Sequence, residues 1–120
     1  EVDKDELLDC FTWTGKIEPY REFTALAAAS LFTNCSDITK FVKIFLTNPN
    51  GEVVTNGLVS QQSILSMREM QVPSGEYGLG TVLYEKTASG DFIFGHTGNN
   101  LPAVNTIVLI NPDTNDAIIQ

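Results

Sequence analysis

The sequence predicts an α+β fold, in which a helical segment at about residues 24–72 precedes an antiparallel β meander at about residues 77–120. Two observations indicate this fold. Apolar residues recur at helical spacing in the middle of the chain, and after residue 77 short apolar runs alternate with turn residues. Because 120 residues make about one small domain, we expect a single unit with a mainly helical part, 1–75, and a sheet part, 76–120.

Residues 1–22 are mostly polar and are expected to be irregular after a short helix at about residues 3–10. We expect Trp13 to anchor this segment onto the core. Small residues dominate 24–32, which favours a helix by propensity, with a closely packed extended chain as the alternative.

The best-marked helix begins near residue 35. Asn34 and Ser36 are both candidate N-caps, and Asp37 favours the positive end of the helix. The turn sequence at 48–51 ends it. The apolar residues that follow the caps are spaced i, i+3, i+4, i+7, i+8: Ile38, Phe41, Val42, Phe45 and Leu46.

A second helix is expected to open at Ser60 and to end near Val72. Its apolar residues are Ile64, Leu65, Met67 and Met70.

Four strands are expected after the helices, at about 77–84, 92–97, 104–111 and 116–120. Their short connections favour antiparallel neighbours. A small meander needs something packed on its apolar face, and no helix follows the last strand. We therefore expect an incomplete domain, completed by a missing N-terminal part of the same fold or by a self-associated copy.

Composition excludes several classes of function. The net charge of −8, from 7 Lys and Arg against 15 Asp and Glu, argues against a nucleic-acid partner. No apolar run approaches the roughly 18 residues that span a membrane. Cys10 and Cys35 favour two separate thiols over a disulfide, and no residue spacing indicates a metal site. We expect no cofactor and no metal.

The principal candidate site is the stretch 92–100, an apolar strand that runs into a polar turn. It holds His96, the only histidine in the chain, between Gly95 and Gly98. A lone histidine is usually structural, but this glycine-flanked position at a strand end favours a functional role.

Three motifs in order now match one pattern: the segment 28–41, Tyr77-Gly78-Leu79-Gly80, and Gly95-His96-Thr97-Gly98 followed by two apolar strands. Residues 24–120 thereby resemble the C-terminal part of the serine β-lactamase and penicillin-binding protein superfamily. They are most similar to its class C-like hydrolases, which include D-aminopeptidases, D-Ala-D-Ala carboxypeptidases and family VIII-type esterases.

The resemblance implies roles for five residues. His96 matches a basic position that meets substrate or polarises the nucleophile's neighbours, and Thr97 matches the middle of the family's triplet. Gly98, without a Cβ, lets substrate lie along the strand, where Asn100 would also contact it. The backbone N–H of Asn99 matches a donor of the oxyanion hole.

The chain departs from the family in two motifs. Ser-x-x-Lys is absent, since Ser36 and Lys40 have three residues between them, and Tyr-x-Asn is absent as well. We therefore expect a C-terminal fragment of a β-lactamase-like serine hydrolase, inactive alone, whose parent acts on a peptide, ester or β-lactam. The family suggests a periplasmic or secreted parent.

Two alternatives stay open. One is a non-catalytic member of the same fold that binds peptides or a partner. The other is an unrelated α+β interaction module that pairs through its exposed sheet.

Overall fold

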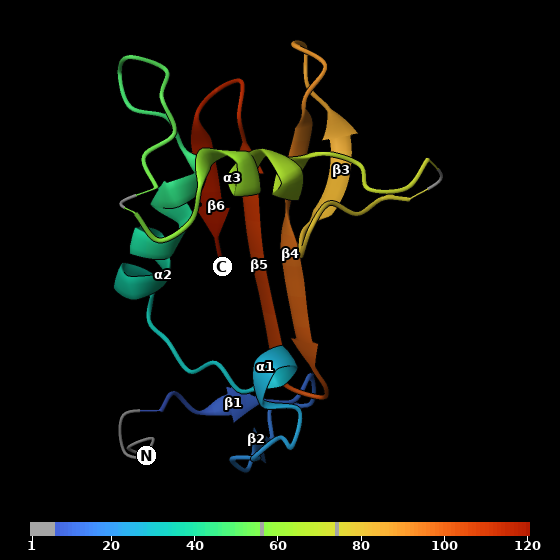
Figure 1. Cartoon of the computed structure of the whole chain (residues 1–120). Helices are drawn as coiled ribbons and strands as arrows, with labels where there is room; N and C mark the ends of the chain where they lie inside the picture. Colours follow the sequence, from blue (N-terminus) through green and yellow to red (C-terminus); the bar gives the residue numbers. More distant parts are fainter. Residues whose placement is uncertain (1–6, 56, 74) are drawn as a thin grey trace.

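The computed structural model describes residues 7–55, 57–73 and 75–120, and it confirms the α+β class (Figure 1). Its largest element is a four-stranded antiparallel sheet with the order β3-β4-β5-β6, the predicted meander. Its strands are β3 (Val82–Lys86), β4 (Phe92–Asn100), β5 (Val104–Asn111) and β6 (Asp116–Ile119).

Short turns join the strands, as the turn residues predict. In the β3–β4 turn, Thr87 N–H donates to the carbonyl of Asp91 at 2.8 Å, and Gly90 N–H donates back to the carbonyl of Thr87 at 3.0 Å. Gly90 has a φ of +91°, which suits a residue without a Cβ. These turns fix the antiparallel register of the sheet.

The first predicted helix forms α2 (Cys35–Val42) and continues as a 3₁₀ turn, η2 (Lys43–Phe45). Its N-cap is Asn34, whose side-chain oxygen accepts from the Asp37 N–H at 2.9 Å. Ser36, the other candidate cap, lies inside the helix. Phe41 is half exposed, so the buried face is narrower than the apolar spacing predicts.

The second predicted helix is α3 (Gln61–Arg68), and Ser60 is its N-cap, accepting from the Ser63 N–H at 3.0 Å. The helix ends at Arg68, before Met70 and Val72. Both of these residues are exposed, so nothing packs on a further turn.

In Figure 1, α3 crosses one face of the sheet and α2 lies beside β6, and the core lies between these helices and the sheet. Phe94, near the start of β4, is fully buried and packs edge-on against Phe45 at a centroid distance of 5.6 Å. The buried residues are Val42, Ile44, Phe45, Ile64, Leu83, Phe94 and Ile110.

The strand predicted at 77–84 begins only at Val82. Gly78 N–H donates to the Thr81 carbonyl in a tight turn, and Gly80 has a φ of +74°. Tyr77 makes only an isolated bridge to Val82. The glycines of this motif therefore form a turn that leads into the strand.

In the N-terminal part, the structure differs from three of the predictions. Residues 3–6 of the predicted helix lie outside the described residues, and 7–10 are not helical but lead into a small hairpin, β1 (Cys10–Phe11) with β2 (Ile17–Glu18). The small-residue segment forms only the one-turn helix α1 (Leu26–Ala29). Trp13 is 93% exposed, so it does not anchor the segment to the core.

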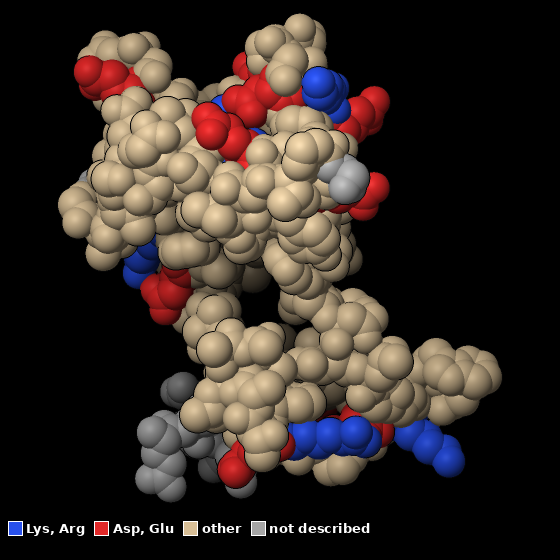
Figure 2. All heavy atoms as spheres, turned by 45° about the vertical axis from the view of Figure 1, so that its right-hand side comes forward, with Lys and Arg blue, Asp and Glu red and all other residues tan. Residues whose placement is uncertain are grey.

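The molecule is elongated as a result. Its extents are 45 × 32 × 25 Å and its radius of gyration is 16.4 Å, against about 14 Å for a compact chain of this length. In Figure 2 a narrow waist separates an upper body, where acidic side chains gather, from a lower part that carries several basic ones.

Candidate functional site: the open edge of strand β4

The candidate site lies where β4 extends beyond β3. The pairing of β3 with β4 ends at Val82 and Gly95. From His96 to Asn100, β4 pairs with β5 alone, and among the described residues no strand lies on its other side. Figure 1 shows β3 beside only the upper part of β4. The Gly-His-Thr-Gly motif therefore occupies an open sheet edge. It lies inside β4 and not at its end, because residues 98–100 continue the strand where a polar turn was predicted.

The register decides which backbone groups face this edge. Ile107 of β5 exchanges both of its backbone hydrogen bonds with Gln120, at 2.8 and 3.0 Å, so its N–H and carbonyl point away from β4. Ile107 is paired with Thr97, and Asn105 is paired with Asn99. Because the direction of the backbone groups alternates along an antiparallel strand, the N–H and carbonyl of Thr97 and Asn99 point to the open edge.

Two glycines of β4 are required by close cross-strand packing. A Cβ at Gly95 would lie far inside van der Waals contact with the backbone carbonyl of Val108, and one at Gly98 would collide with the side chain of Thr106. The family resemblance predicts that Gly98 gives substrate access to the strand, and the contact with Thr106 is a packing reason for a glycine at the same position.

The predicted site residues share an edge and not a face. His96 lies on the same sheet face as buried Phe94, beyond the helices, and is exposed. Thr97 and Asn99 project from the opposite face. The His96 Nδ1 lies 2.6 Å from the Thr97 carbonyl oxygen. The ring therefore leans over the open edge.

The remaining contacts hold Asn99 and Asn100 in place. The Asn99 side chain donates from Nδ2 to Oδ1 of Asn105 at 2.6 Å, which leaves its backbone N–H clear of its own side chain. Asn100 pairs with Val104 at the end of the hairpin, and its carbonyl accepts from the Ala103 N–H. The backbone of Asn100 thus closes the turn. Asn105, which no sequence motif indicated, belongs to the site through this amide pair.

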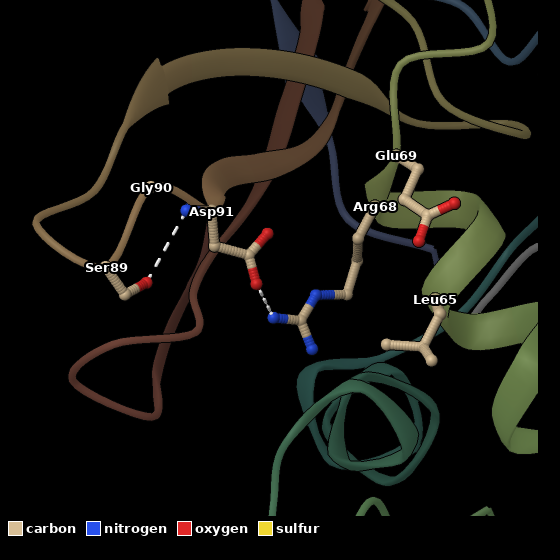
Figure 3. Close-up of a pocket in the computed structure, with 6 residues that line it drawn as sticks. All are labelled: Leu65, Arg68, Glu69, Ser89, Gly90 and Asp91. Carbon is tan, nitrogen blue, oxygen red and sulfur yellow. Dashed lines mark hydrogen bonds and ion pairs between the residues drawn. The ribbon is translucent and has the colours of Figure 1, made fainter.

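A shallow pocket lies at the opposite end of β4, away from the predicted site (Figure 3). Arg68 of α3 is largely buried and pairs with Asp91, and its guanidinium carbon lies 5.5 Å from the centroid of the Phe94 ring. Its Nε is buried, with no partner among the described residues. Leu65, Glu69, Ser89 and Gly90 complete the lining. Because Asp91 and Glu69 flank the single arginine, this pocket has no net positive charge for an anion.

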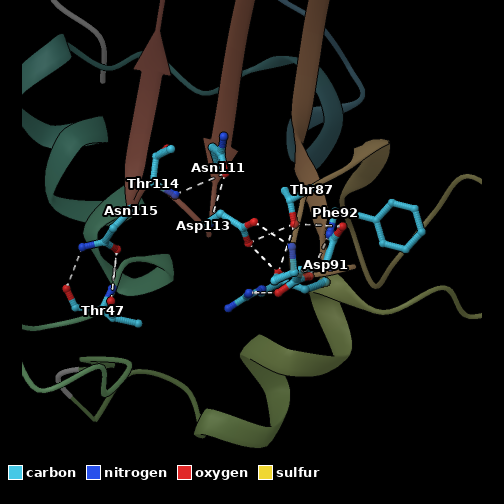
Figure 4. Close-up of polar contacts among 10 residues, drawn as sticks. Thr47, Thr87, Asp91, Phe92, Asn111, Asp113, Thr114 and Asn115 are labelled. Atoms are coloured by element: carbon cyan, nitrogen blue, oxygen red, sulfur yellow. Dashed lines mark hydrogen bonds and ion pairs between the residues drawn. The ribbon is translucent and has the colours of Figure 1, made fainter.

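Polar contacts beside this pocket tie the two turns of the sheet together (Figure 4). Asp113 accepts from the Ser89 hydroxyl at 2.5 Å, the Ser89 N–H at 2.9 Å and the Thr87 hydroxyl at 2.9 Å. The hydrogen bonds from Ser89 hold the pKa of the Asp113 carboxyl below its usual range, because they stabilise the charged form. This network supports the sheet and lies away from the open edge.

Within the part of the chain that the structure describes, Cys10 and Cys35 are free thiols. No cluster of three or more His, Cys, Asp or Glu side chains in that part is arranged to hold a metal ion. None of the helices in that part of the chain has the length and apolar character needed to cross a membrane.

Comparison with known proteins gives no match: no family model, no curated protein and no solved structure is similar to this chain. Inference about function therefore rests on the geometry of the open edge.

Proposed function

We propose that the His96–Asn100 edge of β4 is one wall of the active site of a β-lactamase-like serine hydrolase. The parent enzyme would transfer the acyl group of a peptide, ester or β-lactam to water. A serine and a lysine outside these 120 residues would supply the nucleophile and its base, since Ser-x-x-Lys is absent here.

One observation supports this proposal above the others, namely that the Asn99 N–H points outward from the open edge of β4. When a serine oxygen attacks a carbonyl carbon, the carbonyl oxygen gains the negative charge. An N–H fixed in a β-strand stabilises that charge without having to reorganise. Because the Asn99 side chain is held by Asn105, this N–H is free to donate.

The same edge suits the substrate's main chain. The N–H of Thr97 and the N–H and carbonyl of Asn99 are spaced as in a sheet ladder. An acyl compound with amide groups can therefore form hydrogen bonds with them. Gly98, between them, places no side chain against the ligand.

A substitution that removes the backbone donor tests the proposal. In the parent protein, with its upstream sequence joined to this chain, Asn99→Pro should lower kcat for a chromogenic nitrophenyl ester or cephalosporin about 10²- to 10³-fold. Proline is tolerated at a sheet edge because the lost N–H lies outside the ladder.

Asn99→Ala is the matched control, because it keeps the N–H and removes only the contact with Asn105. It should retain activity, and both variants should unfold at similar urea concentrations. Full activity in Asn99→Pro, or an upstream sequence without Ser-x-x-Lys, contradicts the proposal.

The unpaired edge favours one second candidate, a binding protein of the same fold without a nucleophile. Its Thr97 and Asn99 groups could bind a peptide as an added strand. A parent that binds short acylated D-amino-acid peptides yet hydrolyses neither test substrate belongs to this class.

A further inference from the structure

The contact between His96 and Thr97 fixes the hydrogen-bonding character of the only imidazole in the chain. Nδ1 lies 2.6 Å from the Thr97 carbonyl oxygen. A carbonyl oxygen can only accept a hydrogen bond, so Nδ1 must carry a proton. In the neutral ring, the lone pair then resides on Nε2. Among the described residues, Nε2 has no hydrogen-bond partner, and the side chain is exposed.

The same contact changes what the open edge offers to a ligand. The Thr97 carbonyl points to the open edge, where an added strand would bring an N–H donor about 2.9 Å from it. The ring nitrogen already lies beside that carbonyl and uses one of its two lone pairs. In the neutral ring, Nε2, which lies farther out, is then a second acceptor at this point of the edge.

The geometry points to a specificity-determining role for His96: in its neutral form, the ring held by the Thr97 carbonyl presents Nε2 as a hydrogen-bond acceptor. The site therefore takes a compact acyl compound that carries a hydroxyl, amine or amide N–H donor near its reacting carbonyl. This inference rests on the proposed function for the identity of the reacting carbonyl. In its neutral form the ring supplies an acceptor at the position where the family resemblance implies a basic residue.

An extended peptide strand fits this edge less well than a compact ligand. A strand paired along β4 would lie about 4.8 Å away, and its N–H opposite Thr97 would have to share the carbonyl with the imidazole ring that lies beside it. A compact ligand avoids this crowding, because its carbonyl can accept from Asn99 N–H while its donor reaches Nε2.

Imidazole ¹⁵N NMR of the 120-residue chain tests the tautomer directly, since one histidine gives one pair of nitrogen signals. At about pH 8.5, well above the pH at which histidine side chains titrate in water, the folded chain should show a protonated Nδ1 and a lone-pair Nε2. In urea the pattern should shift toward the Nε2–H form that free imidazole side chains prefer.

Thr97→Ala is the control, because it keeps the main-chain carbonyl and should keep the tautomer. A folded chain with its proton on Nε2 overturns the inference. That result would leave the Asn99→Pro test of the proposed function unaffected.

A pair of variants in the parent protein tests the specificity role. His96→Gln places an acceptor oxygen near the Nε2 position, whereas His96→Asn can replace only the Nδ1 donor. His96→Asn should lose about tenfold more kcat/KM than His96→Gln for a nitrophenyl ester of an N-acetylated amino acid, the value of about one hydrogen bond. Equal losses, or a larger loss in His96→Gln, contradict the role.

Discussion

Gly95 is the residue at which β4 changes from a strand paired on both sides to a strand paired on one. It is buried, and an added Cβ would meet the main-chain carbonyl of Val108. A backbone obstacle of this kind cannot rotate away. The position of the open edge therefore depends on a glycine that the packing of the sheet requires.

Gly95→Ala should destabilise the fold by about 2–3 kcal/mol, because the β4–β5 pair must separate to admit the methyl group. Urea unfolding measures the loss. Gly98→Ala should cost less, since its obstacle is the Thr106 side chain, and Thr106→Ala should relieve part of that cost. An equal cost for both glycines would contradict the packing argument.

Asp113 should give stability a specific pH dependence. Its pKa in the folded chain lies below the usual value of an aspartate, chiefly through hydrogen bonds from Ser89. A group whose pKa is lowered on folding stabilises the fold above its unfolded pKa, and this contribution is lost as pH falls through the folded pKa.

Asp113→Asn should therefore lower the urea midpoint at pH 7, and its difference from the unmodified chain should shrink as the pH falls below about 4. Ser89→Ala should have a similar effect, and the double variant should lose less than the sum of the two single losses. A pH-independent difference would indicate that the charge of Asp113 is not involved.

At the scale of elements, one side chain of the β5–β6 turn forms hydrogen bonds with the segment that follows η2. Asn115, at φ 57°, accepts with Oδ1 from the Thr47 N–H at 2.8 Å and donates with Nδ2 to the Thr47 carbonyl at 3.0 Å. Figure 4 shows this amide facing the backbone of Thr47. The link holds η2 against the end of the sheet.

Asn115→Gly keeps the positive φ and loses the amide, whereas Asn115→Ala loses both advantages. We expect a loss of about 1 kcal/mol for glycine from the hydrogen bonds, and about 1–2 kcal/mol more for alanine from the backbone conformation. Equilibrium urea unfolding of both variants checks the order. Alanine equal to glycine would mean that the φ at this position costs nothing.

Local signals predicted the elements whose boundaries are set locally. Asn34 and Ser60 cap their helices as expected, and the turn after Asn111 joins two strands. The start of β3 was missed because the Tyr77–Gly80 motif alternates like a strand, yet its glycines make a turn. Sequence alternation alone does not distinguish these two structures.

The candidate site was predictable only in part, for a physical reason. The motif predicted that His96 and Thr97 lie in a strand, but the strand continues through Gly98 to Asn100, where a turn was expected. Which backbone groups face outward could not be predicted, because that depends on the pairing of Ile107 with Gln120 and on the start of β3 at Val82. Both are long-range facts of register.

At the scale of the whole molecule, the described residues before 34 contribute little to the core. None of them is buried, while the core joins the helical layer and the sheet. Trp13 is 93% exposed and Phe94 is fully buried. Truncating these two aromatic side chains should therefore change the free energy of unfolding by very different amounts.

Trp13→Ala should change the free energy of unfolding by less than about 0.5 kcal/mol, whereas Phe94→Ala should lower it by about 3–5 kcal/mol. Urea titration measures both changes. It is followed by far-UV circular dichroism, because this signal does not depend on the tryptophan that one variant lacks. A large loss for Trp13→Ala would show that the lower part of the molecule packs more tightly than its exposure indicates.

Residue-resolved amide hydrogen exchange across β4 tests the central claim most directly. The ladder protects the N–H groups of His96 and Gly98, while those of Thr97 and Asn99 face the open edge. We therefore predict slow exchange at 96 and 98 and fast exchange at 97 and 99 in the folded chain. Uniform protection from 96 to 99 would mean that the edge is covered, and would contradict the site.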